Sequence, residues 1–77
     1  MDRNLLEQHL VVAEEHVRMS ERHVRHQAEL VAQLERDGHE TKLAREILAT
    51  YEQLQVLHVA ERDRLRAAVA APAVHTG

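Results

Sequence analysis

Residues 35–41, Glu-Arg-Asp-Gly-His-Glu-Thr, decide the fold of this 77-residue chain. Gly38 is the one glycine before the last residue of the chain, and glycine suits the left-handed position that ends a helix. Thr41 follows three residues later and is a favoured residue at the start of a helix. Because so short a connection holds two helices side by side and antiparallel, this stretch predicts the turn of a helical hairpin.

Start and stop signals on either side of the turn predict a single domain over residues 1–77. Asn4 is followed three residues later by Glu7, the pattern of an N-terminal capping box. Pro72 pushes the residue before it out of the helical region and so ends the second helix. The predicted elements are a helix over about residues 5–37, a turn at 38–40, a helix over about 41–71 and a frayed tail at 72–77.

Apolar residues recur at alternating steps of four and three in both predicted helices, the heptad pattern of a helix–helix seam. The seam of the first helix comprises Leu6, Leu10, Ala13, Val17, Ser20, Val24, Gln27, Val31 and Leu34. The seam of the second comprises Ala44, Ile47, Tyr51, Leu54, His58, Glu61, Leu65 and Ala68. With the turn centred on His39, we expect Ser20 to face His58 and Gln27 to face Tyr51. The predicted fold class is all-α, an antiparallel two-helix hairpin.

A second stripe runs beside the seam of the first helix with the same steps of four and three. It comprises Leu5, His9, Val12, His16, Met19, His23, His26 and Leu30. A lone hairpin would leave the apolar members of this stripe in water. We therefore expect a twofold homodimer that completes a four-helix bundle. The expected interface residues are Leu5, Val12, Met19, Leu30, Leu48 and Leu57.

Seven histidines are the chemical clue in this sequence, because imidazole is a common ligand of zinc, nickel and copper. His9, His16 and His23 follow one another at steps of about 10.5 Å along a helix, so they cannot share one ion within that helix. A metal site therefore needs the second helix or a second subunit. One candidate set joins His16 or His23 to His58 and Glu61, and another pairs His16 and His23 across a dyad. The candidate ligands are His16, His23, His26 and His58.

Three other interpretations of the histidines compete with a metal site. The simplest is that they are half-buried packing residues whose nitrogens bond to glutamates or water, in a chain without a cofactor. A histidine stripe at an interface would also respond to acid, because imidazole takes up a proton near pH 6.5 and the added charge would split the oligomer. Haem is not expected, because the chain has no cysteine for covalent attachment and Tyr51 is its one aromatic side chain among Phe, Trp and Tyr.

Polar residues at seam positions raise the question of an enzyme. Ser20, His58 and Glu61 are the residue types of a nucleophilic triad. However, a two-helix hairpin has no concave pocket, and its helix-interior N–H groups are already bonded, so an oxyanion hole is missing. Buried polar residues in a heptad seam also fix register and oligomeric state. We favour that structural role for them and expect the chain not to be an enzyme.

Charge and hydropathy exclude two classes of partner. The chain has 10 basic and 13 acidic residues, for a net charge of −3. A nucleic-acid partner is not expected, because Arg18, Arg22 and Arg25 are interleaved with glutamates and form no basic face. The longest apolar run, residues 67–71, is too short to cross a bilayer, and no secretion signal is evident. We therefore expect no membrane partner and a cytoplasmic location.

Three segments between about His16 and Leu65 resemble a group of short bacterial two-helix proteins of unassigned function. These segments are Glu35-Arg36-Asp37-Gly38-His39, Ala44-Arg45-Glu46 followed by Leu48-Ala49-Thr50, and His58-Val59-Ala60-Glu61-Arg62-Asp63-Arg64-Leu65. The resemblance implies the two-helix fold and no activity.

Taken together, the sequence predicts a small non-enzymatic helical module, with an interaction or regulatory role, that acts by self-association and by docking a partner helix. The alternative prediction is a helical bundle that binds or senses a transition metal (Zn, Ni or Cu) through its histidine stripe.

Overall fold

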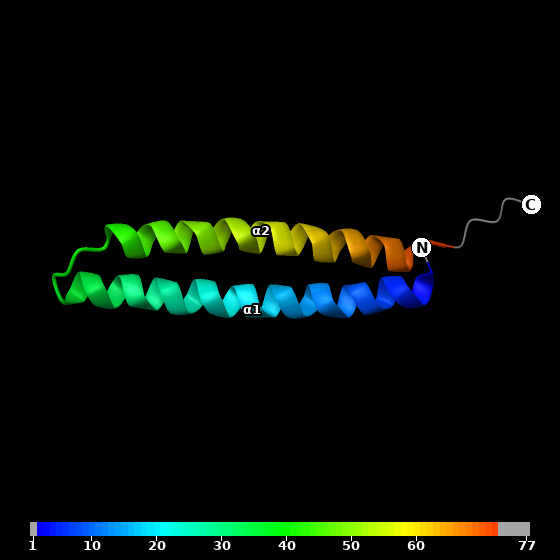
Figure 1. Ribbon diagram of the computed structural model, residues 1–77, viewed down its shortest axis with the longest axis horizontal. Coiled ribbons are helices and arrows are strands. Elements are labelled where there is room, and N and C mark those ends of the chain that lie inside the picture. The colour runs from blue at the N-terminus through cyan, green and yellow to red at the C-terminus, as the bar shows by residue number, and fades with distance from the viewer. Residues whose placement is uncertain (1, 73–77) are drawn as a thin grey trace, which may run out of the picture.

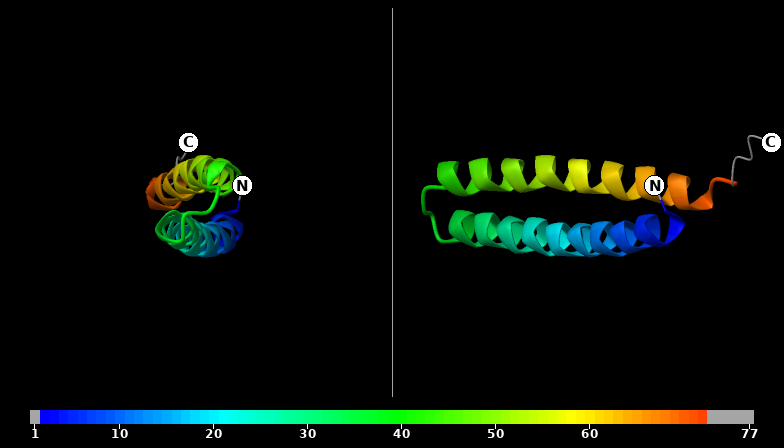
Figure 2. Two further views of the ribbon diagram at one scale, coloured as in Figure 1. Left: turned by 90° about the vertical axis from the view of Figure 1, so that its left-hand side faces the viewer. Right: turned by 45° about the vertical axis from the view of Figure 1, so that its right-hand side comes forward.

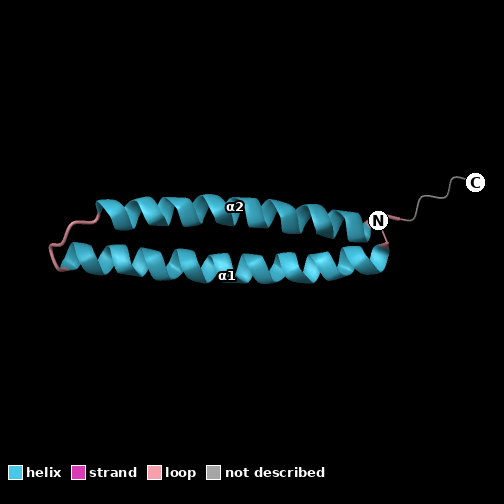
Figure 3. Ribbon diagram, viewed as in Figure 1, coloured by secondary structure: helices cyan, strands magenta, loops and turns pink. Residues whose placement is uncertain are grey.

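The computed structural model describes residues 2–72, which form two helices and no strand. Helix α1 spans Arg3–Arg36 and helix α2 spans Lys42–Ala70. The intervening segment reverses the chain, so that the helices lie side by side and antiparallel (Figure 1; Figure 3). At 1.5 Å per residue they are about 50 and 43 Å long. The predicted all-α hairpin is confirmed, and within residues 2–72 neither helix is long and apolar enough to cross a membrane.

The first helix begins earlier than the sequence predicts. Asp2 is its N-cap, with an extended backbone (φ −60°, ψ 135°) and a carboxylate that accepts the N–H of Asn4 at 3.2 Å. Glu7 pairs with Arg3 at 3.3 Å instead of reaching back to a cap residue. The prediction of Asn4 as the cap is therefore wrong. Aspartate caps a helix as well as asparagine does, and the earlier start adds two residues to the helix.

The C-terminus of α1 closes with the glycine motif that the turn sequence predicts. Gly38 adopts a left-handed backbone with φ 71°. The N–H of His39 donates to the carbonyl of Leu34 at 2.8 Å, and the N–H of Gly38 donates to the carbonyl of Glu35 at 3.1 Å. These two bonds form a Schellman motif and satisfy carbonyls that would otherwise be free at the helix end.

We expect Gly38→Ala to destabilise the protein by about 1–2 kcal/mol, because the left-handed conformation strains any residue with a Cβ. No atom lies within 4 Å of the position that a Cβ would occupy, so the cost comes from the backbone alone. Asparagine tolerates this conformation better, and Gly38→Asn should lose less. Urea unfolding at one fixed protein concentration measures both. Equal losses for alanine and asparagine would contradict backbone strain as the cause.

The second helix begins and ends close to the predicted residues. Thr41 occupies the N-cap position, but its side chain makes no capping bond. The carboxylate of Glu40 takes that role and accepts the N–H groups of Thr41 and Lys42 at 3.1 and 3.0 Å. At the other end, Ala71 is extended (φ −65°, ψ 137°), as expected for a residue before proline. The predicted tail lies, from residue 73 onward, outside the described residues.

The core is a narrow seam between the two helices, and no third element covers them within the described part of the chain (Figure 2). All nine predicted seam positions of α1 are buried or half-buried. Among residues 2–72 the buried apolar residues are Ala13, Val17, Val31, Ala44 and Leu65, four of which are alanine or valine. The hydroxyl residue Ser20 is buried with them.

The seam of α2 is rotated relative to the prediction. The positions that face α1 are Ala44, Leu48, Tyr51, Gln55, His58, Arg62, Leu65 and Val69, all buried or half-buried. The predicted members Ile47 and Leu54 are 37% and 43% exposed, and Glu61 is exposed as well, whereas the predicted member Ala68 is half-buried. Both series have steps of four and three and share every second residue, so periodicity alone cannot separate them. The rotation lets the long stem of Arg62 cover the seam and turns two large aliphatic residues outward.

The register differs from the prediction by about one helical turn of α1. The ring of His58 meets His16, not Ser20, and the ring of Tyr51 meets His23, not Gln27. The Gln27 side-chain amide instead donates to the main-chain carbonyl of Ala44 at 2.9 Å. This bond joins the helices near the turn and satisfies a half-buried polar group, the structural role predicted for polar seam residues.

Candidate functional site

One long face of the hairpin concentrates the exposed apolar side chains, and we call it the open face. In each helix, the heptad positions that flank the seam on one side lie on this face. Its apolar members are Leu5, Val12, Met19 and Leu30 of α1 with Leu43, Ile47, Leu54 and Leu57 of α2, which are 37–68% exposed. The other two exposed large hydrophobic residues, Val11 and Val56, lie on the outer sides of their helices. The exposed apolar residues therefore follow one side of the hairpin and are not scattered over its surface.

The open face also holds most of the histidines. His9, His16, His23 and His26 occupy positions of α1 that alternate with its exposed apolar residues. Among the described residues, this face holds one ion pair, between Glu61 and Arg64 at 2.6 Å. Its two members are assigned to the face by their heptad positions. With neutral histidines, this surface is close to uncharged.

A groove of about 300 Å³ lies at the centre of the open face. Its lining comprises His16, Met19, Ser20 and His23 from α1 and Tyr51, Leu54 and His58 from α2. Two ring contacts cross it from helix to helix. His16 and His58 have ring centroids 5.3 Å apart at an interplanar angle of 56°, and His23 and Tyr51 have centroids 5.4 Å apart at 32°. Both separations are typical of packed aromatic rings, so these contacts help to set the register.

A second groove of about 220 Å³ continues the open face toward the chain ends. It is lined by His9, Val12, Ala13 and His16 from α1 and by Glu61 and Leu65 from α2. The Arg64 guanidinium donates to both carboxylate oxygens of Glu61, at 2.6 and 3.1 Å. This hydrogen bonding lowers the pKa of Glu61 below its ordinary value. The carboxylate is thus ionised and engaged at neutral pH.

The three residue types of a triad do not form a relay in the structure. The hydroxyl of Ser20 is buried and donates its proton to the carbonyl of Val17 at 2.8 Å. Glu61 is bound by Arg64, and the ring of His58 faces His16. The hydrogen bond expected between Ser20 and His58 is therefore replaced by a bond within α1.

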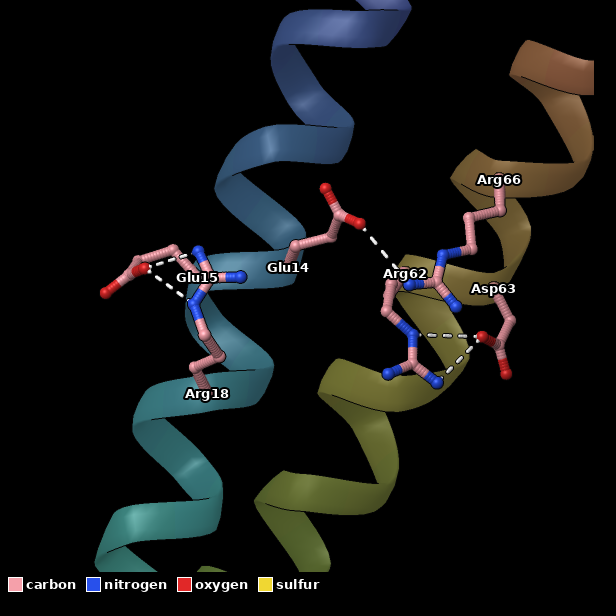
Figure 4. Close-up of polar contacts among 6 residues, drawn as sticks. All are labelled: Glu14, Glu15, Arg18, Arg62, Asp63 and Arg66. Atoms are coloured by element: carbon pink, nitrogen blue, oxygen red, sulfur yellow. Dashed lines mark hydrogen bonds and ion pairs between the residues drawn. The ribbon is translucent and has the colours of Figure 1, made fainter.

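The opposite long face is closed by ion pairs between the helices. Arg66 of α2 reaches Glu14 of α1 at 3.3 Å (Figure 4). Nearer the turn, Arg45 of α2 pairs with Glu35 of α1. Pairs exposed to solvent add little to stability, but they cover this face with charge. The hairpin therefore has one charged face and one apolar, histidine-rich face.

The predicted metal ligands are only partly brought together. His16 and His58 meet across the helices, whereas His23 packs against Tyr51. His26 lies on the open face but lines neither groove. Within residues 2–72 no three residues among His, Asp and Glu converge on a point that could hold a metal ion. Within one chain, His16 and His58 are therefore the two candidate ligands whose rings the structure brings together across the helices.

The predicted interface residues fall on the open face with one exception. Leu48 is half-buried in the seam, because α2 is rotated from the predicted phase. Leu57, by contrast, is 64% exposed. The rotation adds Ile47 and Leu54 to the exposed apolar set, and Leu43, which flanks the seam in either phase, is exposed as well. The sequence signal that could have found them is the alternative heptad phase of the second helix.

The arginines of the first helix do not form a bare basic surface. Arg18 donates to one carboxylate oxygen of Glu15 at 2.6 and 3.1 Å (Figure 4). This hydrogen bonding lowers the pKa of Glu15. Glu21 lies among Arg22 and Arg25 on the same surface. Carboxylates and guanidinium groups alternate here, as the sequence indicates.

Comparison with protein-family models, with curated proteins and with solved structures finds no match for this chain. The resemblance to short bacterial two-helix proteins therefore stays a prediction, and the functional argument depends on the geometry of the open face.

Proposed function

We propose that this chain is a small non-enzymatic interaction module that acts by self-association, with the open face covered by the open face of a second copy. The product would be a twofold four-helix bundle. The observation that supports this proposal most directly is the segregation of exposed apolar residues. Eight of them lie on the open face, whereas the opposite face carries the ion pairs Arg45–Glu35 and Arg66–Glu14 between the helices.

The small core of a single hairpin supports the same proposal. No large side chain of the described residues is completely buried, so the core of a single hairpin is small. Complete burial of one aliphatic side chain from full exposure contributes about 1.5–3 kcal/mol. Eight side chains that are about half exposed would contribute roughly 6–12 kcal/mol per copy, enough to offset the lost freedom of two associating chains.

Charge also favours a second copy as the occupant of the open face. Apart from the pair Glu61–Arg64, this face presents no ion pair within the described part of the chain, so two open faces with neutral histidines meet without like-charge repulsion. The exposed apolar residues lie beside the seam and repeat at heptad spacing. Helices that contact two neighbours in a four-helix bundle have such a second apolar row. A partner helix with an apolar stripe would fit the same face, and its binding would compete with self-association.

The experiment that tests the proposal is sedimentation equilibrium of the untagged chain at neutral pH with a metal chelator present. We expect the mass of a dimer above a micromolar-range concentration, with reversible dissociation on dilution. A mass of 8.8 kDa across the whole range would contradict self-association. The chelator ensures that a dimer observed here does not depend on a metal.

A further inference from the structure

The strongest unexplained feature of the central groove is the pairing of two imidazoles from different helices. His16 belongs to α1 and His58 to α2, and their ring centroids lie 5.3 Å apart. The rings are inclined at 56° and not stacked. Both line the central groove, which also holds the small side chain of Ser20. Packing alone would be served better by aliphatic residues at these two positions.

The separation of the two rings matches that of two imidazoles on one metal ion. A zinc–nitrogen bond is about 2.0–2.1 Å, so two imidazoles at a tetrahedral angle have ring centroids roughly 5 Å apart. Zinc, nickel and copper all accept neutral imidazole nitrogen. An ion bound between the two rings would therefore accept one nitrogen from each of them at the separation that the structure shows.

The other polar side chains near the pair explain why the site has two protein ligands. Glu61 lines the adjoining groove with His16, but both of its oxygens accept hydrogen bonds from Arg64. Ser20 donates its proton within its own helix. No third ligand among residues 2–72 converges on the pair, so water would fill the remaining coordination positions.

We propose that His16 and His58 form a two-imidazole site for a divalent ion of the zinc, nickel or copper class, which joins α1 to α2 across the central groove. The two residues lie 42 positions apart in the sequence, so the unfolded chain does not hold them together. An ion bound by both therefore stabilises the folded hairpin by mass action. The site belongs to one chain and does not require the second copy.

Thermal unfolding with and without Zn²⁺ tests this site. We use chelator-treated protein at pH 7.5 and at one fixed concentration below that at which the wild type dimerises, so that no second copy covers the central groove, and follow helix content by circular dichroism. Saturating Zn²⁺ should raise the Tm of the wild type by about 5 °C or more. His16→Ala and His58→Ala should each lose most of that rise. His26→Ala is the matched control, because it removes an exposed histidine of the same stripe that lines neither groove.

Three results would overturn the inference. One is a wild type whose Tm does not respond to Zn²⁺. Another is an unchanged response in either His16→Ala or His58→Ala. The third is a loss in His26→Ala as large as that in His58→Ala, which would indicate diffuse binding along the stripe. Self-association is measured separately in chelator, so the failure of the metal site and the failure of the proposed dimer give different patterns.

Discussion

Met19→Glu should convert the dimer to a monomer at concentrations where the wild type is fully associated. Met19 lies at the middle of the open face, lines the central groove and is 40% exposed in the hairpin. In the proposed dimer, each copy would bury a carboxylate without a partner, which costs several kcal/mol. We expect the dissociation constant to rise by at least about 100-fold, equivalent to about 2.7 kcal/mol. Sedimentation equilibrium measures the change.

The matched control for this substitution is Val11→Glu. Val11 belongs to the same helix and is 63% exposed, but it lies on the outer side away from the open face. Glutamate is a good helix former, so neither substitution should weaken α1 through helix propensity. An unchanged dimer in Met19→Glu would show that the open face is not the interface. Dissociation of Val11→Glu to the same extent would place the interface on the outer side of α1.

Loss of helix on dissociation is a separate outcome that the same samples reveal. The hairpin core is small, and a monomer can be marginally stable on its own. If circular dichroism shows Met19→Glu to be unfolded, Leu57→Gln provides a milder test from the other helix. Leu57 is 64% exposed in the hairpin, so an uncharged polar substitution there removes interface contacts without disturbing the seam. A wild-type dissociation constant for a folded Leu57→Gln would contradict the proposal.

The features of the fold that could be predicted from the sequence are local ones. Gly38 alone has the conformational freedom for the helix C-terminus, and the chain reverses within a few residues of it. The seam of α1 was predictable because the neighbouring stripe of the same helix contains four histidines. These polar side chains mark the neighbouring stripe as the more exposed of the two. Composition distinguishes the two faces of α1 where periodicity does not.

The seam of α2 could not be predicted in the same way. Its two heptad phases contain similar numbers of apolar residues, and Ile47 and Leu54 favour the phase that the structure rejects. The choice depends on contacts between distant residues, such as the ion pair of Glu14 with Arg66 and the bond from Gln27 to Ala44. Tertiary packing decides between alternatives that local sequence leaves equal.

The candidate site shows the same division. The histidine stripe is visible in the sequence because His9, His16 and His23 are spaced by seven residues. Which of these histidines meets His58 depends on the register, and a shift of about one turn exchanges Ser20 for His16. The sequence therefore predicts that histidines form the site, whereas the pairing of His16 with His58 is found only in the structure.

Acidification from pH 7.5 to 5.5 should dissociate the proposed dimer. An ordinary imidazole takes up a proton near pH 6.5, and the open face of each copy holds His9, His16, His23 and His26. A proton on an imidazole at a closed apolar interface loses hydration, so the monomer binds more protons than the dimer. By linkage, association then weakens as the pH falls through the range in which histidine titrates. We expect at least a 100-fold rise in the dissociation constant.

The groups that face these histidines do not offset the added charge. From α2 they are Tyr51, Leu54, His58 and the pair of Glu61 with Arg64. Arg64 lowers the pKa of Glu61 below the ordinary value of 4.5, so this carboxylate stays ionised and paired at pH 5.5. The contribution of such a carboxylate is lost only as the pH falls further, through its lowered pKa. This carboxylate therefore does not contribute to the response expected between pH 7.5 and 5.5.

Two variants separate the stripe from the other histidines. Replacement of His9, His16, His23 and His26 together by glutamine keeps side chains of similar polarity that do not titrate, and should abolish most of the pH dependence. His39→Gln changes an exposed histidine of the turn and should keep it. Sedimentation equilibrium at several pH values, with chelator present, measures each response. A wild-type dimer as tight at pH 5.5 as at pH 7.5 would contradict the burial of these histidines at the interface, even if Met19→Glu dissociates.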